Sequence, residues 1–161
     1  ETADKGTEIQ AKIISIAGGL GTFTPRKPNI SNITDFEDKG IMYMIKDPSE
    51  FNDKIVVIAG GGDSALDWAL ELSKIAKVTL IHRREEFRGA PHTLNQIKKE
   101  GKVDIKTNFQ ISSISGKNNI ESINIKNDDG KICPPPIKEI NHSMEALIAS
   151  IIAVEANFAG T

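Results

Sequence analysis

A chain of 161 residues has the length of one ordinary domain, or of one domain with additional segments. Its hydrophobic fraction of 39% and charged fraction of 26% exclude wholesale disorder and are typical of globular proteins. The formal net charge of −2 provides no basic excess for binding nucleic acid. One cysteine, Cys133, excludes a disulfide framework and a four-cysteine zinc site within the chain.

The sequence shows no membrane-spanning segment. Its longest apolar stretch, residues 146–154, is interrupted by Ser150 and is much shorter than the roughly 20 residues that cross a bilayer. Residues 1–6 lack the basic start and the apolar run of a signal peptide. We therefore expect a cytoplasmic protein that does not contact a membrane.

The amino-terminal part reads as the end of one unit followed by a connector. Residues 7–16 are rich in isoleucine and predict a strand or a strand pair, which ends at the glycines of residues 18–21. We interpret this segment as the edge of a preceding domain. In the connector over residues 24–54, residues 40–45 predict a short strand and residues 48–52 a turn or a single helical turn.

Residues 54–88 contain the pattern of strand, glycine turn, helix and strand. Ile55–Ala59 is a continuous run of apolar, mostly β-branched residues, as expected of a strand covered on both faces. Apolar residues three or four apart then predict a helix that reaches Ala76, with Asp63 or Ser64 as its amino-terminal cap. A second buried strand over residues 77–81 completes a right-handed crossover unit with parallel strands.

The glycine turn of this unit matches a dinucleotide-binding fingerprint. Gly60, Gly62 and Ala65 fit G-x-G-x-x-G/A, in which the glycines allow a tight turn and a close approach to the pyrophosphate. The small third residue lets the helix pack against the strand, and the helix amides then face the phosphates. A tight turn without a ligand is the alternative, and the flanking strand and helix favour the nucleotide site.

The end of the second strand distinguishes NADP from NAD. An NAD site places Asp or Glu there, where it accepts hydrogen bonds from the ribose 2′-hydroxyl. Here the strand leads into His82, Arg83 and Arg84, and Arg88 follows. Guanidinium groups bind a 2′-phosphate in forked, charge-assisted hydrogen bonds, which favours NADP. The alternative is a solvated segment in which the two glutamates between these arginines neutralise them in pairs.

Further elements are predicted downstream of the arginines. A short helix after Pro91 ends near residues 96–99, half-buried strands cover residues 103–107 and 120–125, and residues 127–130 form a turn toward another strand. Three prolines at 134–136 end any strand there, and residues 143–154 predict an apolar helix capped by Ser143.

The glycine motif in residues 58–70 and the His-Arg-Arg motif in residues 78–88 resemble the NADPH-binding domain of thioredoxin-reductase-like flavoproteins. The closer resemblance is to the ferredoxin (flavodoxin)–NADP+ reductases that are built on the same plan. It implies an α/β fold, in which residues 29–131 form a Rossmann-like three-layer NADP-binding domain with a parallel sheet and an added layer of antiparallel strands. Residues 1–28 would be a remnant of the FAD-binding domain with a connector, and residues 132–161 an unassigned tail.

The resemblance also assigns functional residues. Those implied to cradle the pyrophosphate are Gly60, Gly61, Gly62, Asp63, Ser64 and Ala65. Those implied to hold the 2′-phosphate are His82, Arg83, Arg84 and Arg88, and Gly18, Gly19 and Phe23 would lie near the flavin. The implied cofactors are NADP(H) and FAD, and the implied partner is ferredoxin or flavodoxin as electron acceptor, with a homodimer left open. Neither a catalytic acid or base nor a metal ligand is expected.

Three functions follow from these observations. The first is the NADP(H)-binding part of a flavin-dependent oxidoreductase that passes hydride from NADPH to FAD and then electrons to ferredoxin or flavodoxin. The second is a relative of thioredoxin-disulfide reductases, which carry a C-x-x-C pair shortly before the glycine turn; residues 41–45 contain no cysteine. The third is a non-enzymatic NADP-binding module or an inactive remnant.

Overall fold

The computed structural model describes residues 10–13, 30, 32–37 and 39–132, and the backbone of residues 137–138 and 148–149. Its centre is a parallel sheet with the order β3-β2-β1-β7. The strands are β1 (Ile55–Ala59), β2 (Lys77–His82), β3 (Val103–Thr107) and β7 (Ile148–Ala149). All three pairings in this sheet are parallel, so the carboxyl ends of β1 and β2 lie at the same edge.

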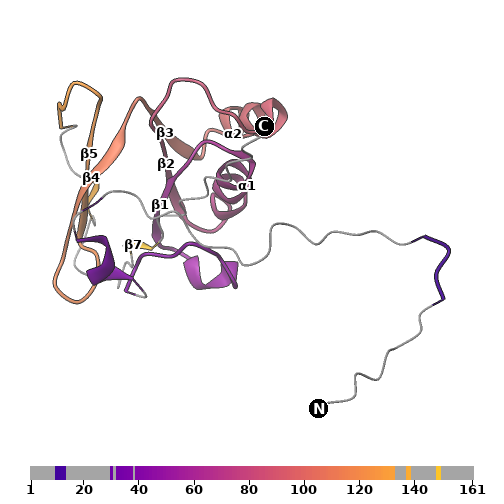
Figure 1. Ribbon diagram of the computed structural model, residues 1–161, viewed down its shortest axis with the longest axis horizontal. Coiled ribbons are helices and arrows are strands. Elements are labelled where there is room, and N and C mark those ends of the chain that lie inside the picture. Colours follow the sequence, from indigo (N-terminus) through magenta and orange to yellow (C-terminus); the bar gives the residue numbers. More distant parts are fainter. Residues whose placement is uncertain are drawn as a thin grey trace, which may run out of the picture.

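Two helices cover one face of this sheet (Figure 1). They are α1 (Asp63–Leu72) and α2 (Pro91–Glu100). Alternate residues of β1 and β2, Val56 with Ile58 and Val78 with Leu80, point toward the helices and form one core with Leu66. Burial of both strand faces explains why these strands are continuous apolar runs.

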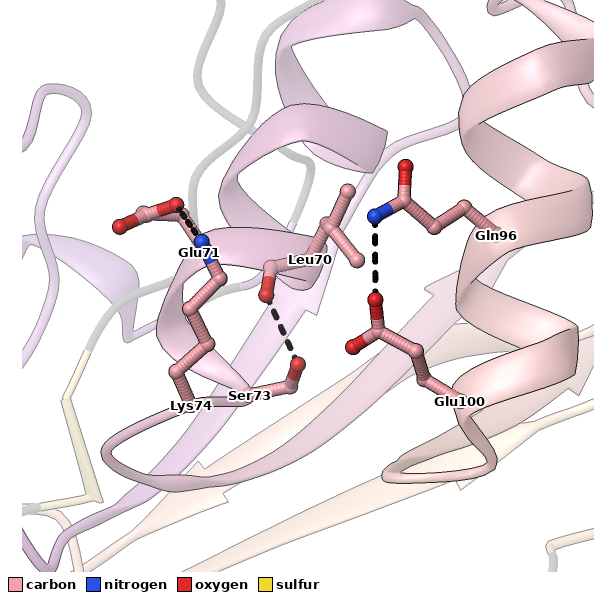
Figure 2. Close-up of polar contacts among 6 residues, drawn as sticks. All are labelled: Leu70, Glu71, Ser73, Lys74, Gln96 and Glu100. Carbon is pink, nitrogen blue, oxygen red and sulfur yellow. Dashed lines mark hydrogen bonds and ion pairs between the residues drawn. The ribbon is translucent and has the colours of Figure 1, made fainter.

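Side-chain contacts stabilise the carboxyl ends of both helices, which are the ends away from the glycine turn (Figure 2). The Ser73 hydroxyl donates to the Leu70 carbonyl over 2.8 Å, directly after the last residue of α1. In the last turn of α2, the Gln96 amide donates to the Glu100 carboxylate over 3.0 Å. The sequence predicted that α1 reaches Ala76. In the structure α1 ends at Leu72, and the next residues form a turn.

A separate antiparallel sheet covers the other face of the parallel sheet (Figure 1). Its order is β4-β5-β6, with bounds Gln110–Ser115, Ser122–Lys126 and Ile137–Lys138. Val57 and Ile81, the residues of β1 and β2 that point away from the helices, share a second core with Ile114 and Ile123. The expected α/β fold, with helices, a parallel sheet and an antiparallel layer, is confirmed.

The connector before β1 contributes to both cores through two single-turn 3-10 helices, Ile33–Phe36 and Pro48–Phe51. Phe36 packs in the core between the sheets and Phe51 in the core beneath the helices. The second of these turns was predicted. The strand predicted over residues 40–45 is wrong, because only Ile41 forms an isolated bridge, to Glu37 within the same connector.

Two further predictions from the sequence are corrected. Residues 10–13 form no strand, and Ile13 is 88% exposed, since no strand of either sheet lies beside them. The helix predicted over residues 143–154 is wrong at Ile148–Ala149, which pair in parallel with β1. A strand satisfies the free hydrogen-bonding edge of β1, which a helix at this position would leave unpaired. Within the described ranges, no helix has the length and apolar character needed to cross a bilayer.

Candidate functional site

The glycine turn connects the carboxyl end of β1 to the start of α1. The amide of Gly60 donates to the carbonyl of Ile81 over 3.0 Å, so the turn begins beside the end of β2. Gly62 is the residue that caps α1, and no side chain caps this helix end. Helix amides that no side chain satisfies, at the positive end of the helix dipole, favour an anionic ligand.

The predicted side-chain cap of α1 is therefore wrong. Asp63 is the first residue of the helix and not its cap, and its carboxylate oxygen accepts a hydrogen bond of 2.6 Å from the amide of Ala90. Ala90 lies 27 residues further along the chain and is itself the cap residue of α2. The Asp63 side chain thus links the starts of two helices.

His82 is the last residue of β2, and its ring lies buried beneath the glycine turn. The side chain is 7% exposed, and a Cβ added to Gly61 would lie 2.2 to 2.5 Å from three atoms of the ring. Nε2 of the ring lies 3.1 Å from the carbonyl oxygen of Glu86, and the ring of Phe87 lies at a centroid distance of 4.9 Å. The absence of a side chain at position 61 is what makes room for the imidazole.

This environment favours the neutral imidazole. Burial lowers the pKa of His82 below the ordinary histidine value, and the nearby guanidinium groups lower it further, while the bond to Glu86 opposes them. A neutral, buried ring contributes no charge to a phosphate site. The ring fills the space beneath Gly61, and the exposed cationic side chains of this region are those of the arginines that follow.

Arg83, Arg84 and Arg88 are exposed, and the segment that carries them folds back onto the glycine turn. The amides of Arg88 and Gly89 both donate to the carbonyl of Gly61, over 2.8 and 3.0 Å. Between them, β2 and this segment therefore hold the arginines at the edge of the sheet where the uncapped start of α1 lies.

The alternative interpretation required that the two glutamates of this segment form ion pairs with the arginines. Within the described ranges, no ion pair joins Arg84 or Arg88 to Glu85 or Glu86. At these two guanidinium groups, the pairing that the alternative required is not formed.

The structure brings two groups of predicted site residues together, the glycine turn from Gly60 to Ala65 and the segment from His82 to Arg88. Ala65 is fully buried, which agrees with a small residue at the close contact between helix and strand. Gly18, Gly19 and Phe23, which the resemblance places near a flavin, lie outside the described residues.

The sequence analysis missed the importance of Gly89. A Cβ added there would lie 2.6 Å from Leu66 Cδ1, 2.9 Å from the carbonyl carbon of Gly62 and 3.0 Å from the amide nitrogen of Asp63. Two of these atoms are backbone, so only glycine allows the arginine segment to lie against the first turn of α1. A glycine directly before Ala-Pro at the start of a helix was the available signal.

The motifs and geometry agree with the comparison to known families. The model of the pyridine nucleotide-disulphide oxidoreductase family matches residues 2–138. The chain belongs to this family.

Within the described residues, no group of three or more His, Cys, Asp or Glu side chains is arranged to hold a metal ion.

Among curated relatives in this family, ferredoxin–NADP reductase 2 of Christiangramia forsetii is 51% identical over 132 residues, covering 80% of this chain and 37% of the relative. The ferredoxin–NADP reductase of Flavobacterium johnsoniae is 51% identical over 129 residues, covering 78% of this chain and 37% of the relative. The chain therefore spans little more than a third of the length of these relatives. The resemblance recognised in the sequence is confirmed.

Solved structures show the same fold. A thioredoxin reductase of Streptococcus pyogenes superposes with a TM-score of 0.69 at 24% identity, covering 82% of this chain and 41% of that protein. A thioredoxin reductase of Giardia duodenalis gives a TM-score of 0.67 at 27% identity, covering 80% and 40%. The likeness extends over about four-fifths of this chain.

Proposed function

We propose that this chain is the NADP(H)-binding part of a flavin-dependent oxidoreductase that passes hydride from NADPH to FAD and then electrons to ferredoxin or flavodoxin. The single observation that carries the nucleotide assignment is the fold of residues 83–90 back onto Gly61. This fold holds the exposed arginines beside the uncapped start of α1. One ligand that carries both a pyrophosphate and a 2′-phosphate fits such a pair of anion-binding surfaces.

The roles of the residues follow from this placement. The turn from Gly60 to Ala65 cradles the pyrophosphate at the start of α1. Its donors are the amides of residues 61–64, since those of Gly60 and Ala65 already donate to carbonyls of the protein. The guanidinium groups of Arg83, Arg84 and Arg88 bind the 2′-phosphate. His82 supports the site from beneath, since its ring is buried against Gly61. The nicotinamide and the flavin supply the hydride and electron chemistry when bound, and the protein positions them.

The electron acceptor is proposed on the names of the relatives. Both curated relatives described above are ferredoxin–NADP reductases. Thioredoxin-disulfide reductases carry a C-x-x-C pair shortly before the glycine turn, and residues 41–45 of this chain contain no cysteine. Ferredoxin or flavodoxin, which accepts electrons without an internal disulfide of the reductase, is therefore the acceptor that we propose.

The nucleotide assignment is tested by calorimetry with NADPH and NADH. The unsubstituted chain should bind NADPH more tightly, and the double variant Arg84→Ala/Arg88→Ala should lose about tenfold or more of its NADPH affinity and little NADH affinity. A matched control, Lys98→Ala/Lys99→Ala, removes the same charge from exposed positions in the last turn of α2 and should change neither affinity. Equal affinity for both nucleotides in the unsubstituted chain would contradict the assignment.

The electron-transfer assignment is tested on the complete flavoenzyme of which this chain is proposed to be the NADP(H)-binding part, loaded with FAD, by following NADPH oxidation at 340 nm. The proposal predicts oxidation that depends on added ferredoxin or flavodoxin and not on a disulfide substrate. Tight NADPH binding without any oxidation would instead support a non-enzymatic NADP-binding module.

A further inference from the structure

The segment that carries the arginines is fixed to the glycine turn by contacts within the protein. The carbonyl of Gly61 accepts from two successive amides, those of Arg88 and Gly89. The amide of the next residue, Ala90, donates to the carboxylate of Asp63 over 2.6 Å. Three consecutive amides of the segment are therefore satisfied by the turn and by the first residue of α1.

Gly89 makes this attachment close. A side chain there would meet the carbonyl carbon of Gly62 at 2.9 Å, a distance that real Cβ atoms essentially never show, and the amide nitrogen of Asp63 at 3.0 Å, which is tighter than most real contacts. Backbone at the start of a helix cannot yield as a flexible side chain does. The arginine segment thus lies directly against the peptide groups that begin α1.

Asp63 places a carboxylate at the helix end to which we assign the pyrophosphate. Its negative charge disfavours a nearby phosphate. Its exposed side chain is instead engaged by the amide of Ala90, the residue immediately before Pro91 and the start of α2. This hydrogen bond ties the end of the arginine segment (residues 83–90) to α1, because Ala90 is the last residue of the segment and Asp63 is the first residue of the helix.

We propose that Asp63 and Gly89 are positioning residues that set the preference for NADPH over NADH without contacting the 2′-phosphate. This proposal rests on the proposed function. They hold the arginine segment, and Arg88 in particular, at a fixed distance from the glycine turn, so that one nucleotide reaches both. NADH has no 2′-phosphate, so its affinity does not change when the segment moves. Only the affinity for NADPH falls.

The test measures the ratio of the NADH and NADPH dissociation constants by calorimetry on the 161-residue chain. Asp63→Ala removes the acceptor of the Ala90 amide, and the preference for NADPH should fall by about three- to tenfold, as expected for one hydrogen bond. Asp63→Asn keeps an oxygen acceptor at the same place and should retain most of the preference. Removing the Asp63 charge acts alike on the pyrophosphate of both nucleotides. Its effect on the additional 2′-phosphate would strengthen NADPH binding, which is opposite to the predicted fall.

The matched control is Asp67→Ala, which removes the same charge from an exposed position one turn further along α1. It should leave the ratio unchanged. Gly89→Ala serves as a second variant, since it moves the same segment by a steric contact and should lower the ratio as well. Thermal unfolding checks that each variant is folded.

An unchanged ratio in folded Asp63→Ala or in folded Gly89→Ala would overturn the positioning role of that residue. An equal loss in Asp63→Asn and Asp63→Ala would also overturn it for Asp63, because keeping an oxygen acceptor for the Ala90 amide would then not keep the preference. These results differ from a failure of the proposed function, in which the unsubstituted chain already binds both nucleotides equally.

Discussion

The contact between Gly61 and His82 predicts a large effect for a very small substitution. In Gly61→Ala, the new Cβ would lie 2.2 Å from Cε1 and 2.4 Å from Nδ1 of the imidazole, whereas carbon atoms in contact lie about 3.5–4.0 Å apart. The ring would have to retreat by more than about 1 Å. Phe87 packs against it and the Glu86 carbonyl lies 3.1 Å from Nε2, so the retreat disrupts packing.

The expected cost is that of overpacking a buried site, about 1–3 kcal/mol of unfolding free energy. Expulsion of the ring would add the loss of its hydrogen bond, about 1 kcal/mol. Urea titration followed by the fluorescence of Trp68, the single tryptophan of the chain, measures this change. Trp68 packs against the core beneath the helices and reports on its unfolding.

A double-mutant cycle separates the steric contact from a general effect of alanine at position 61. With the ring removed in His82→Ala, the further substitution Gly61→Ala should cost less than about 0.5 kcal/mol, because the space is then open. Equal costs of Gly61→Ala with and without the imidazole would refute the contact. So would a cost below about 0.5 kcal/mol in the chain with His82 present.

Three further predictions concern the connector and the buried histidine. Burial first, and then the hydrogen bond and charge of Glu37, raise the pKa of Tyr43 to about 12. An absorbance titration at 295 nm of this single tyrosine should therefore show ionisation well above pH 10, and stability should fall as pH rises from there; a midpoint near 10 in the folded chain would contradict the contact. Because the pKa of His82 is lowered, the unfolded state binds a proton that the folded state does not, so the unfolding free energy should decrease as pH falls through about 6.5. His82→Gln should flatten that slope in urea titrations at several pH values, and an unchanged slope would refute its origin. Phe51→Ala should cost about 3–5 kcal/mol, since this side chain is 1% exposed within the core beneath the helices, and a cost near zero would show that the connector is not part of the domain.

The crossover unit was predictable because each of its signals is local. A strand buried on both faces needs an unbroken apolar run, and Ile55–Ala59 provides one directly before three glycines. The helix end was not predictable from apolar spacing alone. Ile75 and Ala76 lie after the end of α1 and still pack against the core beneath the helices. Their apolar spacing therefore reflects their burial and does not indicate that the helix continues.

The antiparallel layer shows why other elements were missed. β4 contains a bulge between Ile111 and Ser113, which breaks the strict alternation of a strand. Ile111 and Ile114 consequently contact the same core although they are three residues apart. A strand is recognised in a sequence by apolar residues at every second position. Two apolar residues three positions apart in a polar segment do not match that pattern, so the strand was not predicted.

The candidate site was predictable in its residue types and not in its contacts. The glycines and the arginines are adjacent because parallel strands end at one edge, which the pattern implied. The bond from Ala90 to Asp63 and the packing of His82 on Gly61 depend on how residues 83–90 fold back, and no local signal encodes that path. Sequence reasoning therefore assigned Asp63 to a cap that the structure gives to Gly62.

The most direct measurement is a crystal structure of the chain with bound NADP+. We predict the pyrophosphate at the amides that follow Gly60, and the 2′-phosphate within hydrogen-bond distance of Arg84 or Arg88, with the His82 ring still beneath Gly61. A nucleotide bound elsewhere, or bound at the glycine turn with its 2′-phosphate directed away from these guanidinium groups, would contradict it.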